Sequence, residues 1–369
     1  MPVDTIIVTV TPECNLRCAY CQNEPALSEF KPEPIPLELL RKATEQYREL
    51  ADSTGESSPL RFCFSGGEPL LAGLAFFEEV LKMQREIVGD SREVANTLQT
   101  NGTLIDSEWA EFFAGENFGV SVSIDGHPLI QNRQRPMADV ARSSAEATVE
   151  GIRRLKEAGN RYGTLTVLSS LSVDYPAEIF DYLAALEPSM MGFLPCVDRG
   201  PAISASDYGR FMCGLFDAWY AERRSDLFVR EFTHVIQGMV GIPHRKGCQF
   251  GGDCPRHVNL SLDGTVWVCD QYIGKSEGYL GSLRDKTLTE IVEGPRFKRF
   301  RESTRRLPDA CAGCRYLALC NAGCMYRRES SEKRDYLCEG RRMMFAHIEH
   351  RLEEITTEMV DKAREMQLC

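Results

Sequence analysis

The chain has 369 residues, of which 43% are hydrophobic, so it can bury a full core and exceeds the usual size of one domain. Its formal net charge of −11 argues against a nucleic-acid partner, because phosphate contacts need a basic face, and favours a peptide or small molecule. No apolar run approaches the roughly 18 residues of a membrane span and the N-terminus lacks signal-peptide features, so we expect a cytoplasmic protein without membrane contact.

Short β-rich runs alternate with amphipathic stretches from the start of the chain to about residue 196. Strands are predicted at 5–10, 60–65, 94–100, 119–125, 163–171 and 190–195. Helices are predicted near 36–51, 73–89, 106–114, 139–158 and 176–187. This order predicts an α/β fold whose parallel sheet curves into a partial (β/α)6 barrel, similar to part of a TIM barrel.

The second half of the chain differs in composition. A helical connector is predicted at about 206–240, and residues 248–338 are rich in cysteine and glycine, with a short helix near 287–302. This region is expected to depend on metal rather than on a large apolar core. A final helix is predicted at about 339–366. The predicted domains are therefore a barrel at 1–205, a connector at 206–240, a cysteine-rich domain at 241–345 and a C-terminal helix at 346–369.

Four motifs follow the first four predicted strands in order. They are "CNLRCAYC" after the first strand, "GGEP" after the second, "QTNGT" at the end of the third and "SIDG" at the end of the fourth. The carboxyl ends of parallel strands meet at one edge of a sheet, where the connecting loops gather. We therefore expect all four motifs to face one cavity.

The first motif places Cys14, Cys18 and Cys21 on one loop. The 15 cysteines of a cytoplasmic chain stay reduced, so metal binding or redox chemistry explains them better than disulfides. Three thiolates can hold three irons of a 4Fe-4S cluster and leave the fourth iron open. From the spacing alone, a zinc loop completed by a distant ligand, or a chance grouping of thiols, is the alternative.

The loop resembles the CxxxCxxC motif of the radical S-adenosylmethionine (SAM) superfamily, including the aromatic Tyr20 before the third cysteine. The resemblance implies that SAM binds at the open iron and is cleaved by one electron to methionine and a 5'-deoxyadenosyl radical, which takes a hydrogen atom from substrate. It also implies SAM contacts at Tyr20, Gly66, Gly67, Glu68, Ser123, Asp125 and Arg135. Taken singly, each of these residues would be an ordinary turn, strand-end or surface residue.

Eight cysteines in the second half have a more specific spacing. Cys254, Gly264 and Cys269, then Cys311-x2-Cys314-x5-Cys320-x3-Cys324, and finally Cys338 resemble the seven-cysteine SPASM pattern of radical SAM enzymes that modify peptides. With Cys248, eight thiols suffice for two fully ligated 4Fe-4S clusters. The resemblance assigns Cys248, Cys254, Cys269 and Cys324 to a first auxiliary cluster, and Cys311, Cys314, Cys320 and Cys338 to a second. Two zinc ribbons are the alternative. The other cysteines, Cys63, Cys196, Cys213 and Cys369, are predicted to be core fillers or free thiols.

Along essentially its whole length the chain resembles the anaerobic sulfatase-maturating enzymes, which oxidise a serine or cysteine of a sulfatase to formylglycine; "LQTNGTLIDSEW" and "DGTVWVCDQYIG" are among the similar segments. The resemblance implies a general base at Asp270, although a loop aspartate that caps backbone amides is an equal interpretation. It places Gln99 in the substrate cavity. It further implies SAM and three 4Fe-4S clusters, one of them SAM-binding, and an electron donor such as flavodoxin or ferredoxin.

Two positions depart from that family. Ser65 stands where the family commonly has Gln before GGEP, and Asn23 stands where it has Tyr two positions past the third cysteine. Both residues are expected to line the active site and contact substrate. The changes favour an alternative in which the chain matures a ribosomally made precursor peptide by forming thioether or carbon–carbon crosslinks. A non-catalytic, cysteine-rich metal scaffold is the third hypothesis.

Overall fold

The computed structural model describes residues 3–23, 27–55, 57–197, 200–222, 224, 226–242, 248–250, 254, 256–328 and 334–367, with side chains to residue 354. The described strands form one sheet in the order β6-β5-β4-β3-β2-β1-β7-β8-β9. Strands β1 to β7 pair in parallel, whereas β8 pairs antiparallel with β7 and with β9. The predicted α/β fold class is confirmed. The strands are β1 (Thr5–Thr11), β2 (Leu60–Gly66), β3 (Val94–Thr100), β4 (Gly119–Ser123), β5 (Tyr162–Leu168), β6 (Met190–Pro195), β7 (His257–Leu260), β8 (Thr265–Trp267) and β9 (Tyr279–Ser282).

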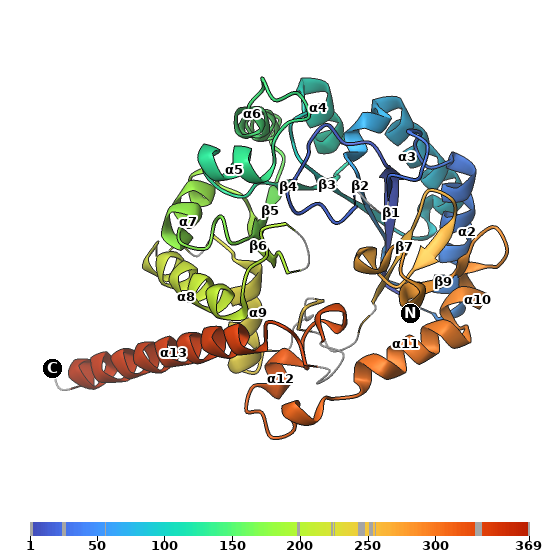
Figure 1. Cartoon of the computed structure of the whole chain (residues 1–369). Coiled ribbons are helices and arrows are strands. Elements are labelled where there is room, and N and C mark those ends of the chain that lie inside the picture. Colours follow the sequence, from blue (N-terminus) through green and yellow to red (C-terminus); the bar gives the residue numbers. More distant parts are fainter. Residues whose placement is uncertain are drawn as a thin grey trace.

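Helices surround the outer face of the curved sheet (Figure 1). Those of the barrel are α2 (Leu37–Ser53), α3 (Leu74–Val88), α4 (Ser107–Gly115), α5 (Pro128–Gln134), α6 (Ser144–Glu157) and α7 (Pro176–Ala185). Alternation along β2 explains the packing: Phe62 and Phe64 are buried toward the helices, where the Phe64 ring meets Phe77 of α3 edge-on at 5.5 Å. The intervening Cys63 and Ser65 are therefore left on the inner face of the sheet.

The remaining helices follow the barrel strands. They are α8 (Ala205–Glu222), α9 (Arg230–Met239), α10 (Leu288–Val292), α11 (Pro295–Arg305), α12 (Leu317–Cys320) and α13 (Cys338–Gln367). The segment before α9 and the first turn of α9 cover the edge strand of the barrel: Met191 N–H donates to Phe228 O at 2.8 Å, and Glu231 Oε2 accepts from Phe193 N–H at 3.1 Å. These bonds satisfy backbone groups of β6 that would otherwise be left without a neighbouring strand.

The observed elements differ from the prediction in several places. Strands β7 to β9 were not predicted, because strands of three or four residues show no readable alternation. The short helix α5 was also not predicted. The helix predicted near 287–302 is two helices, α10 and α11, because Gly294 is the N-cap and Pro295 the first residue of α11. The first of these differences matters most, since β7 joins β1 and brings the cysteine-rich region onto the barrel sheet.

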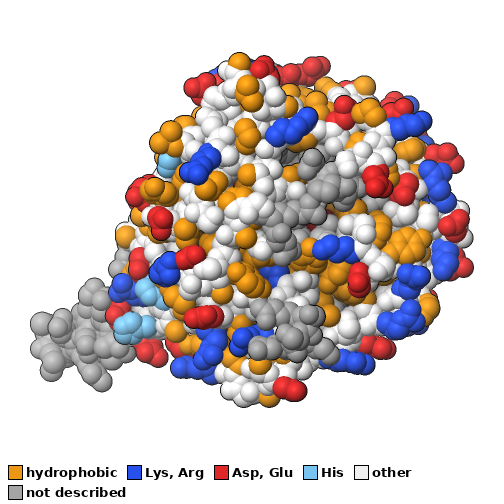
Figure 2. Space-filling view, viewed as in Figure 1, with side chains coloured by type: hydrophobic (Ala, Val, Ile, Leu, Met, Phe, Trp, Pro, Cys, Tyr) orange, Lys and Arg blue, Asp and Glu red, His pale blue; other side chains and the backbone are white. Residues whose placement is uncertain are grey.

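The long helix α13 packs along α8 and extends beyond the body of the protein (Figure 1). The helices approach closely at two glycines: a Cβ on Gly340 would lie 2.0 Å from Ala205 O, and a Cβ on Gly209 would lie 2.8 Å from Gly340 Cα. Figure 2 shows basic and acidic side chains interspersed around the outline of one face, so the charge there is spread. Within the described residues, no helix has the length and apolar character needed to cross a membrane.

Candidate active site

Three thiols lie together on the loop after β1. Cys14, Cys18 and Cys21 are half-buried and form no disulfide, and Cys14 Sγ accepts from Leu16 N–H at 3.4 Å. Burial raises the pKa of Cys14 to about 12, and the negative charges of Glu68, Cys18 and Cys21 act in the same direction. A cation bound among such thiols favours their thiolate form, which burial disfavours. The loop therefore suits a metal centre.

The GGEP turn at the end of β2 holds this loop in place. Gly67 N–H donates to Thr11 O at 2.8 Å, and Glu68 N–H donates to Glu13 O at 2.7 Å. A Cβ on Gly67 would lie 2.0 Å from Glu13 O. The two backbone segments can approach this closely because residue 67 is glycine.

The Glu68 carboxylate is buried and is satisfied by protein groups. Oε1 accepts from Leu70 N–H at 3.1 Å and from the Thr100 hydroxyl at 2.7 Å, and Oε2 accepts from Asn101 N–H at 2.8 Å. Burial raises the pKa of Glu68, and these three hydrogen bonds oppose that shift. Asn101 Nδ2 in turn donates to Asn15 Oδ1 in the cysteine loop at 2.8 Å. Glu68 thus joins three of the predicted motifs.

Tyr20, Asp125 and Arg135 form one buried cluster that adds the SIDG motif. The Tyr20 hydroxyl donates to Asp125 Oδ2 and accepts from Arg135 Nη1, the latter at 2.7 Å. Burial raises the pKa of Asp125, whereas the charge of Arg135 and the Tyr20 hydroxyl oppose the rise. Arg135 Nε is buried and has no hydrogen-bond partner in the described part of the chain. A buried donor without a partner is expected where an anionic group of a ligand binds.

Asp270 lies where the cysteine loop meets the region after β8. Gln22, directly after the third cysteine of the loop, donates from Nε2 to Asp270 Oδ2 at 2.8 Å. Gln271 Nε2 donates to Gln22 Oε1. Asp270 also acts electrostatically on Cys63, which contacts Thr97. Cys63 and Thr97 are paired in register on β2 and β3, and both face the barrel interior.

The other predicted substrate residues take different positions. Gln99 Nε2 donates to Ser123 Oγ at 2.8 Å, which joins a predicted substrate residue to a predicted SAM residue. Ser65 is half-buried on the inner face of β2. Asn23 Nδ2 donates to Gly66 O at 2.7 Å, so its amide is used by the GGEP turn. The link from the loop to Asp270 is made by Gln22.

The first auxiliary set comes together from three segments. Cys254 interacts electrostatically with Cys248, Cys269 and Cys324. A hydrogen bond between Cys254 and Cys248 raises the pKa of Cys254 and lowers that of Cys248 to about 6. Burial raises the pKa of both Cys269 and Cys324. His257, Cys269 and Asp270 each place one ligand atom within 4.8 Å of the others.

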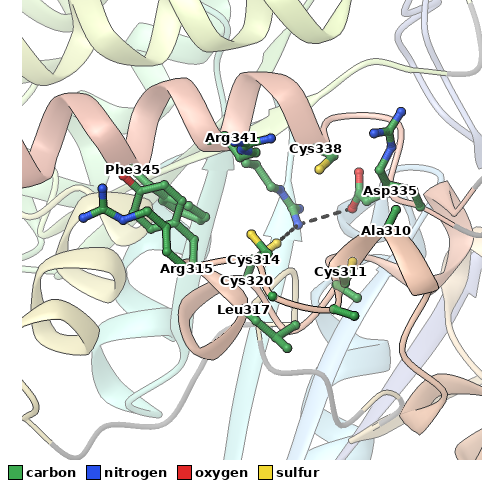
Figure 3. Close-up of a pocket in the computed structure, with 16 residues that line it drawn as sticks. Ala310, Cys311, Cys314, Arg315, Leu317, Cys320, Asp335, Cys338, Arg341 and Phe345 are labelled. Atoms are coloured by element: carbon green, nitrogen blue, oxygen red, sulfur yellow. Dashed lines mark hydrogen bonds and ion pairs between the residues drawn. The ribbon is translucent and has the colours of Figure 1, made fainter.

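The second auxiliary set lines a cavity of about 410 Å³ (Figure 3). Cys338, at the start of α13, interacts electrostatically with Cys320, Cys311 and Cys314. Burial raises the pKa of Cys338 and of Cys311, and neighbouring thiols add to the rise. Figure 3 shows Arg341 reaching from α13 toward Cys320, with Asp335 beside it.

Sequence reasoning missed several residues at these sites. Gln22 could have been found from its position beside a cysteine ligand. Cys63 was predicted to be a core filler or a free thiol; it is a free thiol, half-buried on the inner face of the sheet, and its place in the cavity was not foreseen. Arg230 could not have been found: it begins α9, far along the chain, where it interacts electrostatically with Cys248 of the first auxiliary set, and its Cζ would lie 3.0 Å from a Cβ on Gly192 of β6. Cys369 lies outside the described residues.

Comparisons with known proteins agree with this geometry. Residues 8–183 match the radical SAM superfamily, and residues 252–315 match SPASM, an iron-sulfur cluster-binding domain. A cysteine-type anaerobic sulfatase-maturating enzyme of Clostridium perfringens is 29% identical over 95% of this chain and 97% of its own length. A serine-type enzyme of Bacteroides thetaiotaomicron is 26% identical over 94% of this chain and 89% of its own length. The solved structure of native anSMEcpe with bound AdoMet and Cp18Cys peptide is similar with a TM-score of 0.85 and 25% identity, covering 96% of this chain and 99% of that one.

The chain therefore belongs to the radical SAM superfamily and carries a SPASM iron-sulfur domain. Its relatives along the whole length are anaerobic sulfatase-maturating enzymes of the cysteine and serine types. SAM and iron-sulfur clusters are accordingly its cofactors. The residues present fit them, because the thiols gather into one set of three beside the buried Arg135 Nε and two sets of four.

Proposed function

We propose that this protein is a radical SAM oxidase that converts a serine or cysteine of a sulfatase-type substrate to formylglycine. The sulfatase-maturating relatives of both types support this substrate class. The observation that carries the proposal is the position of Asp270. Its carboxylate accepts from Gln22 of the SAM-cluster loop at 2.8 Å, acts on Cys63 inside the barrel and directly follows Cys269 of the first auxiliary set. A base at this junction reaches the radical source, the substrate cavity and the path for the leaving electron.

Three 4Fe-4S clusters are proposed, one at each cysteine set. When bound at the first loop, the cluster and SAM supply a radical that removes one hydrogen atom from the substrate carbon. Arg135 is proposed to bind the SAM carboxylate through Nε, with Tyr20 and Asp125 fixing its guanidinium. The proposed SAM site at the carboxyl ends of the strands also includes Gly66, Gly67 and Ser123. Glu68 holds the GGEP turn and the strand ends through three hydrogen bonds, and it remains a proposed contact of the SAM amino group, since Oε2 accepts only one of them.

Asp270 is proposed to act as the general base. A serine substrate that has lost a hydrogen atom from its β-carbon must still lose one proton and one electron to become the aldehyde. A cysteine substrate becomes a thioaldehyde by the same loss, and water then converts it to the aldehyde with release of hydrogen sulfide. Asp270 accepts the proton from the substrate hydroxyl or thiol, while Gln22 holds Oδ2 and leaves Oδ1 for the substrate. The electron leaves toward the first auxiliary set, because Cys269 and Asp270 are neighbours in the chain. Gln99, Ser65 and Asn23 remain proposed contacts of the substrate cavity.

The partners follow from this chemistry. The peptide segment of a protein substrate enters the barrel, and a one-electron donor such as flavodoxin or ferredoxin reduces the SAM-binding cluster. A chain with 15 cysteines and iron-sulfur centres suits a reducing compartment, so we place it in the cytoplasm.

The test uses anaerobically reconstituted protein, SAM, a one-electron reductant and peptides that carry the Cys or Ser of a sulfatase. We expect 5'-deoxyadenosine and a product that reacts with a hydrazide, which reveals an aldehyde. The Asp270→Asn variant should form 5'-deoxyadenosine but little product. A peptide that loses two hydrogens without hydrazide reactivity would contradict formylglycine formation and favour a crosslink. Absence of both iron and SAM cleavage would favour the scaffold.

A further inference from the structure

A fully buried guanidinium stands beside the second auxiliary set. Arg341 is 0% exposed, and its Nη1 donates to Cys320 Sγ at 3.8 Å (Figure 3). The same nitrogen lies 3.2 Å from Asp335 Oδ2 and donates to Gln249 O at 3.1 Å. A charge is costly to bury unless surrounding charges compensate for it. Asp335 supplies this compensation, and the same guanidinium also places a donor on Cys320 Sγ.

The fold makes room for this guanidinium at two glycines. Gly340 allows α13 to approach Ala205 of α8, as described above, and Arg341 follows it directly. Gly323 has a φ of 71° and lies against both Arg341 and Asp335, so that a Cβ there would overlap their polar atoms. Arg341 and Asp335 are thus held in place by the backbone on two sides.

The same polar network reaches the first auxiliary set. Asp335 Oδ2 accepts from Cys324 N–H at 2.7 Å, and Arg327 Nε lies 3.4 Å from Asp335 Oδ1. Arg327, Asp335 and Arg341 together carry one net positive charge. Cys320 and Cys324 are four positions apart, which keeps their Cα atoms within about 14 Å. The network therefore lies between the two auxiliary sites.

We propose that Arg327, Asp335 and Arg341 form a redox-tuning bridge, in which Arg341 raises the reduction potential of the second auxiliary cluster and directs electrons to it from the first. A cluster held by four thiolates gains negative charge on reduction, and a buried donor cation at one sulfur stabilises that form. At the first set, Asp335 adds negative charge and accepts the hydrogen bond from Cys324 N–H. The positive charge of Arg327 partly offsets the charge of Asp335. The potential of the second cluster is therefore raised relative to that of the first.

One electron moves at each step of this relay. The inference rests on the proposed function only for the source of that electron, the substrate radical, which also gives its proton to Asp270. The first cluster is reduced and then reoxidised as it reduces the second. The second is reoxidised by a one-electron carrier protein, such as an oxidised flavodoxin or ferredoxin.

The experiment measures the midpoint potentials of both auxiliary clusters by redox titration followed by electron paramagnetic resonance, without peptide substrate. The SAM-binding cluster is removed by replacing Cys14, Cys18 and Cys21 with Ala, so that two centres remain. Arg341→Gln is compared with Arg341→Lys, which keeps the charge, and with Asp335→Asn, which increases the net positive charge. Arg351→Gln is the control, because it removes the same charge from α13 at a site that is 39% exposed and faces Asp217.

We expect Arg341→Gln to disfavour reduction of one of the two centres by at least about tenfold, which is about 59 mV for one electron, and to affect the other less. Arg341→Lys should retain most of the midpoint potential of the affected centre, and Asp335→Asn should raise that potential. The control should leave the midpoint potentials of both centres unchanged. Equal shifts of both centres, or no shift with Arg341→Gln, would overturn the proposal. If Arg341→Gln does not fold, the direction of the Asp335→Asn shift decides. Because no substrate is present, a failure of the proposed function leaves this result unaffected.

Discussion

Replacing Gly67 by Ala should dismantle the contact between the GGEP turn and the cysteine loop. The new Cβ would lie 2.0 Å from Glu13 O, so that oxygen must retreat by roughly 1.4 Å to reach ordinary van der Waals contact. That movement breaks the bond from Glu68 N–H to Glu13 O, at 2.7 Å, and strains the bond from Gly67 N–H to Thr11 O, at 2.8 Å.

The expected cost follows from these contacts. The broken backbone hydrogen bond costs about 1 kcal/mol, the strained one up to about 1 kcal/mol, and overpacking adds about 1–3 kcal/mol, so the loop should be destabilised by about 2–5 kcal/mol. Because the loop must hold this shape to bind cluster and SAM, we expect SAM affinity to fall at least about 30-fold. Equilibrium SAM binding and iron content, measured without oxygen, report this loss.

The matched control is Gly115→Ala in α4, where a Cβ would meet no atom within 4 Å. This variant should bind iron and SAM like the unchanged protein. The reasoning would be refuted if Gly67→Ala kept its full iron content and bound SAM within about threefold of normal, since about 0.7 kcal/mol cannot accommodate the overlap.

Three further predictions test other parts of the site. Gln22→Met removes the donor to Asp270 and should slow product formation by about 10- to 150-fold while sparing 5'-deoxyadenosine formation; the effect should vanish in an Asp270→Asn background, and additive losses would contradict it. Asp125→Asn leaves Arg135 buried without its carboxylate, so chemical denaturation should show a loss of about 3–5 kcal/mol, and an unchanged midpoint would count against the buried pair. Removing iron with a chelator should open the second auxiliary cavity, so hydrogen exchange should rise across 311–327 but not in β2; uniform exchange would argue against a metal-held segment.

Periodicity and motif order were enough to predict the barrel. A strand was predicted at 60–65, and in the structure Phe62 and Phe64 alternate with Cys63 and Ser65, so that one face of this strand packs toward the helices. The motifs after successive strands were expected to share one edge, and Glu68 does join the GGEP turn to Asn101. These features depend on local pattern and on the geometry common to parallel sheets, both of which are present in the sequence itself.

The sequence by itself determined which cysteines are candidate ligands, because their spacings resemble family patterns and metal ligands of this kind must be thiolates. Only the tertiary structure decided which side chains surround them. Gln22 rather than Asn23 reaches Asp270, Arg230 fills the space left by Gly192, and Arg341 is buried beside Cys320. Each of these contacts joins residues far apart in the chain, so its existence depends on how whole helices and strands pack, and no local pattern records it.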